Sequence, residues 1–424
     1  MQVFERPELL PAEPNIDPDV TSKLRWDFDR FATDGLPDEL EAFILEEYGI
    51  DVSSEYAGYE IRNPWGKASG QLSMTARQVQ EDVDAGLGFV VLKTVIAEDG
   101  AGEQTMAAWA IKESRMLVES IAGQNGETGW TVRWKGRGWW QSFDDYLRLI
   151  RDASDIAKSS DTLIVPSCKY HLPRPDETEW NRSEYEFTTR AMLEAWHSTD
   201  ERPMPLEKDF SPTLAGSDLA TVQTQILEWL EIVPSLIRYL GNVPVDNAQN
   251  KHAERAPVRI GLKVFNAMFD DEFQLRMLEK VHQTDAEPCD FYIHGNRLFD
   301  PDRDFDGHKG IAYGGPDLSD RNLRVMHEFA RRRQNAGGLP WCATGNILSG
   351  RTAVEYALLG ASSFQLHTGF QLPSEEYSMK VGNKTQKTLH KLYFHPTDGF
   401  IAWCLHVAGQ KSLDHPIRFR DIVG

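Results

Sequence analysis

The chain has 424 residues, of which 41% are hydrophobic and 26% charged, a composition typical of a globular protein with a large core. Its formal net charge of −20 would repel phosphates, so neither nucleic acids nor anionic membranes are expected as partners. The four cysteines are scattered without a CxxC pair. The sequence therefore encodes neither a disulfide framework nor a cysteine-ligated zinc or iron–sulfur site.

The first 58 residues are expected as an acidic leader with one helix over Pro37–Tyr48, where apolar residues recur at helical spacing. The N-terminus carries acids and prolines where a signal peptide needs a basic patch and an apolar run. No stretch approaches the roughly 18 apolar residues of a membrane span. We therefore expect a cytoplasmic protein.

From residue 59 onward, apolar strand-like runs alternate with amphipathic helices, which predicts βαβ units and a parallel sheet. Buried parallel strands read as continuous apolar runs. The predicted strands are Phe89–Val95, Thr162–Pro166, Val258–Val264, Phe291–His294, Leu339–Ala343 and Ser363–His367. The predicted helices are Thr75–Ala85, Phe143–Lys158, Asp218–Leu240, Asp271–His282, Asp320–Gln334 and Arg351–Leu359. This alternation fits either a closed barrel or an open doubly wound sheet.

Two segments interrupt the alternation. Residues 169–217 are polar, aromatic and rich in proline, and they are too long for an ordinary βα loop. They are expected as an active-site lid or as an insertion without a role in the site. Residues 370–424 are expected as a C-terminal extension that packs on the main domain or on a partner subunit.

Two lysines lie within apolar strands, Lys93 in FVVLKTV and Lys263 in RIGLKVF. A lysine in a buried strand is costly unless it has an anionic partner. Either each lysine forms an internal ion pair, or the two together face a bound anion.

Two segments near the C-terminus each combine a strand with a glycine turn. Residues 341–347 read WCATGNI, and residues 360–369 read GASSFQLHTG. In many (β/α)₈ barrels the loops after strands seven and eight bind a phosphate group. The order and spacing favour a phosphate site over two unrelated turns.

Taken in order, the motifs between Asn63 and Gly369 resemble the dihydroorotate dehydrogenase (DHODH) family. This resemblance implies a (β/α)₈ TIM barrel over residues 59–369, with a long insertion after strand four, and FMN as the cofactor. The residues that it places against FMN are Ala68, Ser69, Gly70, Lys93, Asn125, Lys263, Gly314, Gly315, Gly345, Asn346, Thr368 and Gly369.

The resemblance also implies catalytic residues. Cys168 falls where soluble members carry a catalytic cysteine, which would act as acid/base during hydride transfer together with Lys93. The simpler alternative is a buried structural cysteine at the end of a strand.

The substrate face departs from the family pattern. Val165 and Tyr170 stand where the family has asparagines that bind the orotate ring, and Tyr292 replaces another. A site that loses such hydrogen bonds discriminates strongly against its former substrate. The residues expected to contact a different substrate are Tyr170, His171, Tyr292, His294 and Asn296.

Three functions follow from this comparison. The first is an FMN oxidoreductase that moves a hydride between flavin and a small polar substrate other than dihydroorotate. The second is a true dihydroorotate or dihydropyrimidine dehydrogenase, and the third is a non-redox phosphate-binding barrel such as a lyase, an isomerase or a binding protein. For an oxidoreductase, we expect a separate electron acceptor or reductase and a homodimer.

Overall fold

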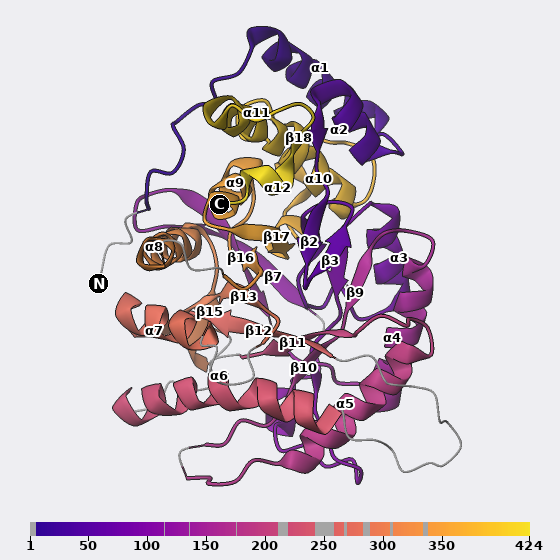
Figure 1. Ribbon diagram of the computed structural model, residues 1–424, viewed down its shortest axis with the longest axis vertical. Helices are drawn as coiled ribbons and strands as arrows, with labels where there is room; N and C mark the ends of the chain where they lie inside the picture. Colours follow the sequence, from indigo (N-terminus) through magenta and orange to yellow (C-terminus); the bar gives the residue numbers. More distant parts are fainter. Residues whose placement is uncertain are drawn as a thin grey trace.

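The computed structural model describes residues 6–113, 115–134, 136–174, 176–210, 219–241, 258–266, 269–282, 289–305, 308–333 and 338–424. Within these residues, ten strand segments form one parallel sheet that helices surround (Figure 1). The segments are β4 (Trp65–Lys67), β5 (Phe89–Val91), β6 (Val95–Ile96), β9 (Leu163–Val165), β10 (Ser167–Lys169), β11 (Pro205–Asp209), β12 (Arg259–Phe265), β13 (Phe291–Asn296), β16 (Trp341–Thr344) and β17 (Ala361–Leu366).

The sheet closes into a barrel through two strands, each of which is interrupted and therefore counted as two segments. β5 and β6 are successive parts of one strand, and so are β9 and β10 on either side of Pro166, which has no N–H to donate. β5 pairs with β9 and β6 pairs with β10. The ten segments in the described residues thus make eight parallel strands. The predicted (β/α)₈ barrel is confirmed.

One helix of the described chain follows each barrel strand. These helices are α3 (Ala76–Asp84), α4 (Phe143–Ala157), α5 (Arg182–His197), α6 (Leu219–Gly241), α7 (Asp271–Val281), α8 (Pro316–Arg332), α9 (Gly350–Leu358) and α10 (Lys384–Phe394). The predicted helices match α3, α4, α6, α7, α8 and α9, although Asp218 and Gln334 at two predicted ends lie outside the described residues. α8 begins earlier than predicted, because Gly315 has a φ of +98° and Pro316 suits the first helical position.

Polar side chains determine where several of these helices begin. Thr75, Ser142, Asp270 and Ser349 each accept a hydrogen bond from a backbone N–H in the first turn of α3, α4, α7 and α9, respectively. Such a cap stabilises a helix by about 1 kcal/mol. These polar residues thus mark where each βα loop ends and its helix begins.

Residues 169–217, expected as a lid or an insertion, supply a regular unit of the barrel. The described part contains α5 and β11, and β11 pairs with β10 on one side and β12 on the other. β11 reads Pro-Leu-Glu-Lys-Asp, so its charged residues conceal a buried strand from a search for apolar runs. β9–β10 is therefore the third barrel strand and β11 the fourth, which shifts Cys168 from strand four to strand three. Residues 175 and 211–217 of this segment lie outside the described residues.

The two ends of the chain pack together beside the barrel, at the top of Figure 1. α1 (Pro18–Asp34), which was not predicted, lies against α10, and β1 (Ile50–Asp51) pairs with β18 (Ile417–Arg418). The helix expected over Pro37–Tyr48 is α2 (Leu40–Tyr48). The other helices of this layer are α11 (Phe400–Lys411) and α12 (Phe419–Ile422). Because α10 follows the last barrel strand, the barrel extends beyond residue 369.

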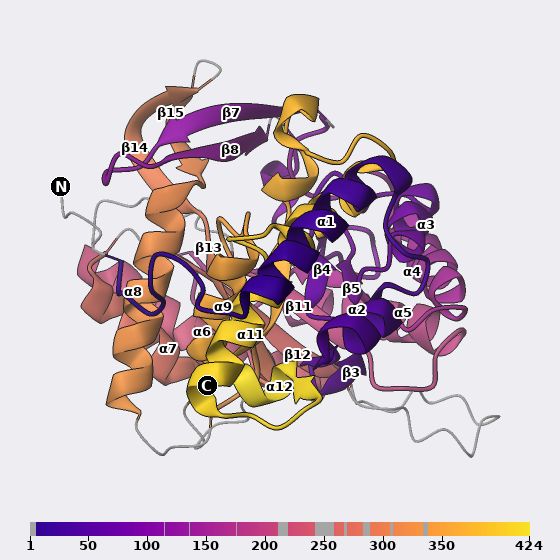
Figure 2. The same ribbon diagram turned by 90° about the horizontal axis from the view of Figure 1, so that it is seen from above.

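Hairpins cover the two ends of the barrel. The β2–β3 hairpin (Ser54–Tyr56 and Tyr59–Ile61) places Tyr56 against Phe89 and Phe291, the first residues of two barrel strands. At the other end, Figure 2 shows the β7–β8 hairpin (Met116–Ala122 and Thr128–Trp134) beside the β14–β15 hairpin (Leu298–Phe305 and His308–Tyr313). This second pair, rather than residues 169–217, covers the carboxyl ends of the strands.

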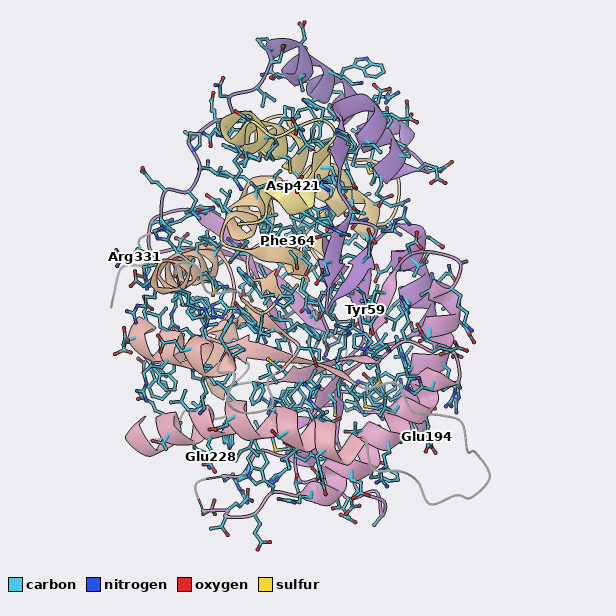
Figure 3. All side chains as sticks on the ribbon, viewed as in Figure 1. Tyr59, Glu194, Glu228, Arg331, Phe364 and Asp421 are labelled. Carbon is cyan, nitrogen blue, oxygen red and sulfur yellow. The ribbon has the colours of Figure 1, made fainter. Side chains whose placement is uncertain are left out.

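Strand alternation sorts buried side chains between the barrel interior and the layer beneath the helices. Leu163 and Val165 of β9 belong to the interior cluster with Ile293, whereas Ile164 belongs to the larger outer core. Figure 3 labels Glu194 of α5 and Glu228 of α6, whose charged side chains are exposed. None of the helices in the described residues combines the length and apolarity that a bilayer span requires.

Candidate functional site

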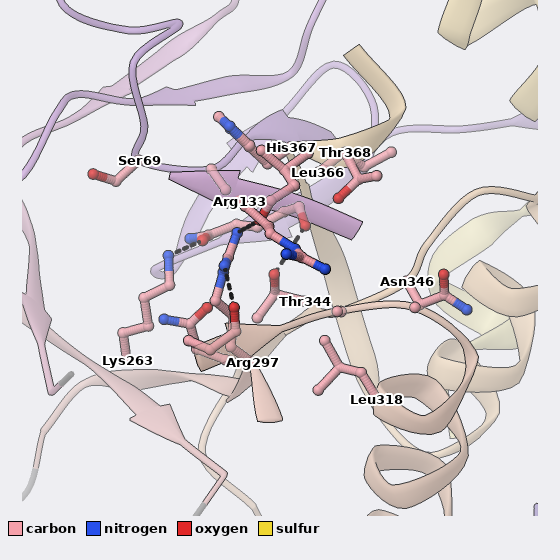
Figure 4. A pocket seen from close by; sticks show the side chains of 18 of the residues that line it. Ser69, Arg133, Lys263, Arg297, Leu318, Thr344, Asn346, Leu366, His367 and Thr368 are labelled. Atoms are coloured by element: carbon pink, nitrogen blue, oxygen red, sulfur yellow. Dashed lines mark hydrogen bonds between the residues drawn. The ribbon is translucent and has the colours of Figure 1, made fainter. Parts of the chain in front are cut away.

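A cavity of about 360 Å³ lies at the carboxyl ends of the barrel strands, beneath the β7–β8 and β14–β15 hairpins (Figure 4). Its volume falls within the range of about 300–1,000 Å³ that is typical of ligand and cofactor sites. Active sites of (β/α)₈ enzymes lie at this end of the barrel. This cavity is therefore the candidate active site.

The loops after β16 and β17 form one side of the cavity. They bring together the predicted phosphate-loop residues Gly345, Asn346, Thr368 and Gly369. Gly345 has a φ of +109°, and a Cβ there would approach Asn322 Nδ2 to 2.8 Å. Glycine is thus the residue that this turn accommodates without strain. Asn322 Nδ2 also donates to the Thr344 carbonyl oxygen at 3.0 Å, which holds the loop in place.

Four other predicted small residues line the cavity: Ala68, Ser69, Gly314 and Gly315. Ser69 begins a chain of buried hydroxyl groups. Its Oγ lies 2.8 Å from Thr94 Oγ1, which lies 2.9 Å from Ser167 Oγ. This chain links the cavity surface to the third barrel strand.

Lys93 lines the cavity and is 2% exposed. It follows β5 rather than lying within it, and its Nζ donates to Gln71 Oε1 at 3.2 Å. Burial, which Asp209 opposes and the nearby cations Lys263 and Arg297 reinforce, lowers the pKa of Lys93 to about 7. Both protonation states of Lys93 are therefore populated near neutral pH.

Lys263 also lines the cavity, but it has an internal partner. Its Nζ lies 3.1 Å from Glu207 Oε1 and 2.9 Å from Gln365 Oε1. Gln365 Nε2 donates to Glu207 Oε2 at 2.6 Å and to the Tyr56 hydroxyl at 3.1 Å. This buried network fixes the Lys263 ammonium at the floor of the cavity and balances its charge.

Three arginines that the sequence did not single out also line the cavity: Arg133, Arg137 and Arg297. Arg297 donates to the Val132 and Ala312 carbonyl oxygens at 2.6 and 3.0 Å and so joins the two covering hairpins. Burial lowers the pKa of Arg297 to about 10. Including the two lysines, the described lining carries five cationic side chains and a single carboxylate, that of Asp209. The cavity is positive within a protein of net charge −20.

Cys168 does not line the cavity. Alternation along β10 turns Ser167 and Lys169 toward the interior and Cys168 toward the helices. Cys168 is fully buried in the outer core, and burial raises the pKa of its thiol well above the ordinary value. Its place matches the structural cysteine considered as the alternative.

Two predicted substrate residues next to Cys168 also lie outside the cavity. The Tyr170 ring stacks on Tyr185 of α5 at 4.6 Å, and its hydroxyl lies 2.8 Å from Thr189 Oγ1. His171 Nε2 lies 3.1 Å from a carboxylate oxygen of Glu177. Both side chains thus hold α5 and the loop before it against the barrel.

On β13, the structure separates the three predicted substrate residues. Asn296 lines the cavity. Tyr292 packs between His282 and Trp341, and its ring lies 5.0 Å from that of His282. His294 is fully buried, and burial lowers its pKa to about 3. Because side chains alternate along a strand, Tyr292 and His294 face the helices together.

Two predicted cofactor residues lie beside the cavity rather than in its lining. The Gly70 carbonyl oxygen accepts from Ser73 N at 3.3 Å in a turn after β4. Asn125 lies in the turn of the β7–β8 hairpin, where its Nδ2 donates to Asp320 of α8 at 3.1 Å. Asn125 therefore docks the hairpin onto α8.

Other lining residues were missed for different reasons. Trp109 lies in the 3₁₀ helix η1 (Ala107–Trp109), which carries no apolar signal. His367, directly before η2 (Thr368–Phe370), ends the predicted strand Ser363–His367 but was not chosen as a site residue. Asp209 ends β11, which was hidden by its charges. The buried Glu-Lys-Asp run in β11 is the sequence signal that could have located this part of the site.

No family model and no curated protein matches the sequence. Solved structures of DHODH from Eimeria tenella are similar to the whole chain. The ferulenol complex has a TM-score of 0.52 and 15% identity, over 98% of this chain and 97% of that one. The ligand-free enzyme has a TM-score of 0.58 and 14% identity, over 96% and 99% of the two chains. At this identity, the likeness establishes a DHODH-like fold.

Proposed function

We propose that the chain is an FMN-dependent oxidoreductase that moves a hydride between a small polar substrate and flavin N5. The observation that carries this proposal is the convergence of two features in one cavity. The loops at Gly345–Asn346 and Thr368–Gly369 lie on one side of the cavity. Lys93 and Lys263 line the same cavity from other strands of the barrel. The likeness of the whole fold to DHODH supports the same assignment.

The residues around the cavity fit FMN. A phosphate requires positive charge and small loop residues, and the described lining offers five cations against one carboxylate together with five glycines. Positive charge along a cavity wall attracts an anionic group such as a phosphate. We assign the phosphate to the loops at Gly345–Asn346 and Thr368–Gly369, and the flavin ring to Ala68, Lys93 and Lys263.

Lys93 is the proposed acid/base. When a CH–CH bond is oxidised, one hydrogen leaves as a hydride and the other as a proton. FMN, when bound, supplies the hydride acceptor, and Lys93 Nζ accepts the proton. Because its pKa is about 7, Lys93 can accept and return a proton near neutrality. Cys168, the acid/base suggested by the sequence, lies outside the cavity and is not retained in this role.

An absorbance spectrum of the purified protein tests the cofactor assignment. We expect flavin absorbance, either as purified or after reconstitution with FMN and removal of the excess. Gly345→Ala is the matched variant, because its Cβ would clash with Asn322 and alter the phosphate loop. Wild-type protein that stays colourless after reconstitution would overturn the proposal.

Anaerobic titration with dihydroorotate separates the two redox functions. Bleaching of the flavin with formation of orotate would identify a dihydroorotate dehydrogenase. Flavin that stays oxidised would leave the cofactor assignment intact and direct the search to other substrates. The separate electron acceptor and the homodimer remain predictions of the sequence comparison.

One observation favours the non-redox alternative. Glu207 already balances the charge of Lys263, so this lysine does not require an anionic flavin as its partner. A colourless protein that binds inorganic phosphate through the loops at Gly345 and Thr368 would support a non-redox barrel.

A further inference from the structure

Lys169 is a buried cation at the end of the third barrel strand. Its side chain is 0% exposed, and its Nζ has no hydrogen-bond acceptor among the residues that the structure describes. The Nζ lies 3.9 Å from Asp209 Oδ2 and 4.4 Å from the centre of the Trp109 ring. Asp209 and Trp109 both line the cavity. The ammonium group therefore lies directly behind the cavity wall.

Positive charge is in excess at this end of the cavity. Arg137 also lines it and donates from Nε to the Trp109 carbonyl oxygen at 2.6 Å. Lys169 lies 3.9 Å from Asp209, the single carboxylate in the described lining, and Lys93 interacts electrostatically with the same carboxylate. Burial lowers the pKa of Lys169, an effect that Asp209 opposes and Arg137 reinforces. A buried polar group without a hydrogen bond costs about 1–3 kcal/mol, and more when it is charged.

We propose that Arg137, which lines the cavity beside Trp109, binds a carboxylate group of the substrate, and that the positive charge of Lys169 behind Trp109 and Asp209 stabilises this anion. This inference rests on the proposed function, which makes the cavity the substrate site, and it narrows the substrate class to small carboxylates. A carboxylate offers acceptors for the guanidinium group of Arg137, and the buried charge of Lys169 attracts the same anion across a wall of low dielectric constant. Because Asp209 lies close to Lys169 and interacts electrostatically with Lys93, a carboxylate held here would keep the substrate's carbon chain beside Lys93.

Isothermal titration calorimetry with succinate, and with succinamide as its uncharged counterpart, tests this subsite. We expect wild-type protein to bind succinate at least tenfold more tightly than succinamide. Lys169→Met should weaken succinate binding about tenfold, because it removes a buried positive charge that attracts the anion through the cavity wall. Lys158→Met is the matched control, because this lysine is 56% exposed at the end of α4 and should leave binding unchanged.

A second variant separates charge from structural damage. Asp209→Asn removes the carboxylate that competes for Lys169, so it should tighten succinate binding, which a merely damaged site would not do. Equal affinity of the wild type for succinate and succinamide, or unchanged binding in Lys169→Met, would overturn the inference.

The titrations are run on both FMN-loaded and flavin-free protein. If FMN-loaded wild type and FMN-loaded Lys169→Met bind succinate equally well, the subsite is refuted and the proposed function stands. Protein that never binds FMN but binds succinate through Lys169 refutes the proposed function alone.

Discussion

Replacing Lys93 by methionine should stabilise the protein at low pH. The folded state lowers the pKa of Lys93 from 10.5 to about 7. At about 1.4 kcal/mol per pH unit, the buried charge costs the folded state on the order of 5 kcal/mol below pH 7. Methionine removes that cost but loses the hydrogen bond to Gln71, which is worth about 1 kcal/mol. The expected gain in the free energy of unfolding at pH 6 is therefore on the order of 4 kcal/mol.

The size of the effect depends on pH. Between the folded pKa of about 7 and the unfolded value of 10.5, the unfolded chain binds the extra proton, so wild-type stability rises with pH. The advantage of Lys93→Met should thus shrink through this window and vanish near its upper end. Urea denaturation of flavin-free protein at pH 6, 8 and 9.5 measures it, with Lys158→Met as the control. A difference that is independent of pH, or a variant less stable at pH 6, would refute this account of Lys93.

Three other predictions follow from the described contacts. Glu207→Gln leaves Lys263 buried without its counter-ion and should lower the free energy of unfolding by about 3–5 kcal/mol in urea denaturation, whereas adding Lys263→Met should recover part of the loss. A double variant no more stable than Glu207→Gln would contradict this coupling. Gly345→Ala should cost about 1–3 kcal/mol of stability through backbone strain and reduce the FMN content measured by absorbance, and full occupancy would contradict a tight loop. Cys168→Ser should leave both the FMN content and the pH–rate profile unchanged, because the thiol faces the outer core, and a shifted profile would restore Cys168 as an acid/base.

Much of the barrel could be read from local patterns. Apolar runs such as Phe89–Val91 and Arg259–Phe265 are buried on both sides, and the helices between them begin at polar caps. Apolar strand runs and helix caps each involve a few neighbouring residues, so both can be recognised in the sequence. The glycine loops at Gly345 and Gly369 were predictable for a similar reason, because a turn at the end of a strand restricts the local backbone.

The fourth strand was not visible in this way. β11 turns polar side chains into the barrel. Its Glu207 can be buried there because it forms an ion pair with Lys263 and accepts a hydrogen bond from Gln365, both on other strands. A charge that is neutralised by distant residues looks, in sequence, like a charge exposed to water. Missing this strand shifted the strand count, which assigned Cys168 to strand four.

The direction of each side chain was decided by tertiary structure. Cys168, Tyr292 and His294 lie within barrel strands, and strand alternation turns their side chains toward the helices. A one-residue difference in register exchanges the two faces of a strand. Arg137 and Arg297 reach the cavity from loops and hairpins that are far away in sequence. Closure of the barrel brings these cations together, because it places the carboxyl ends of all its strands around one opening.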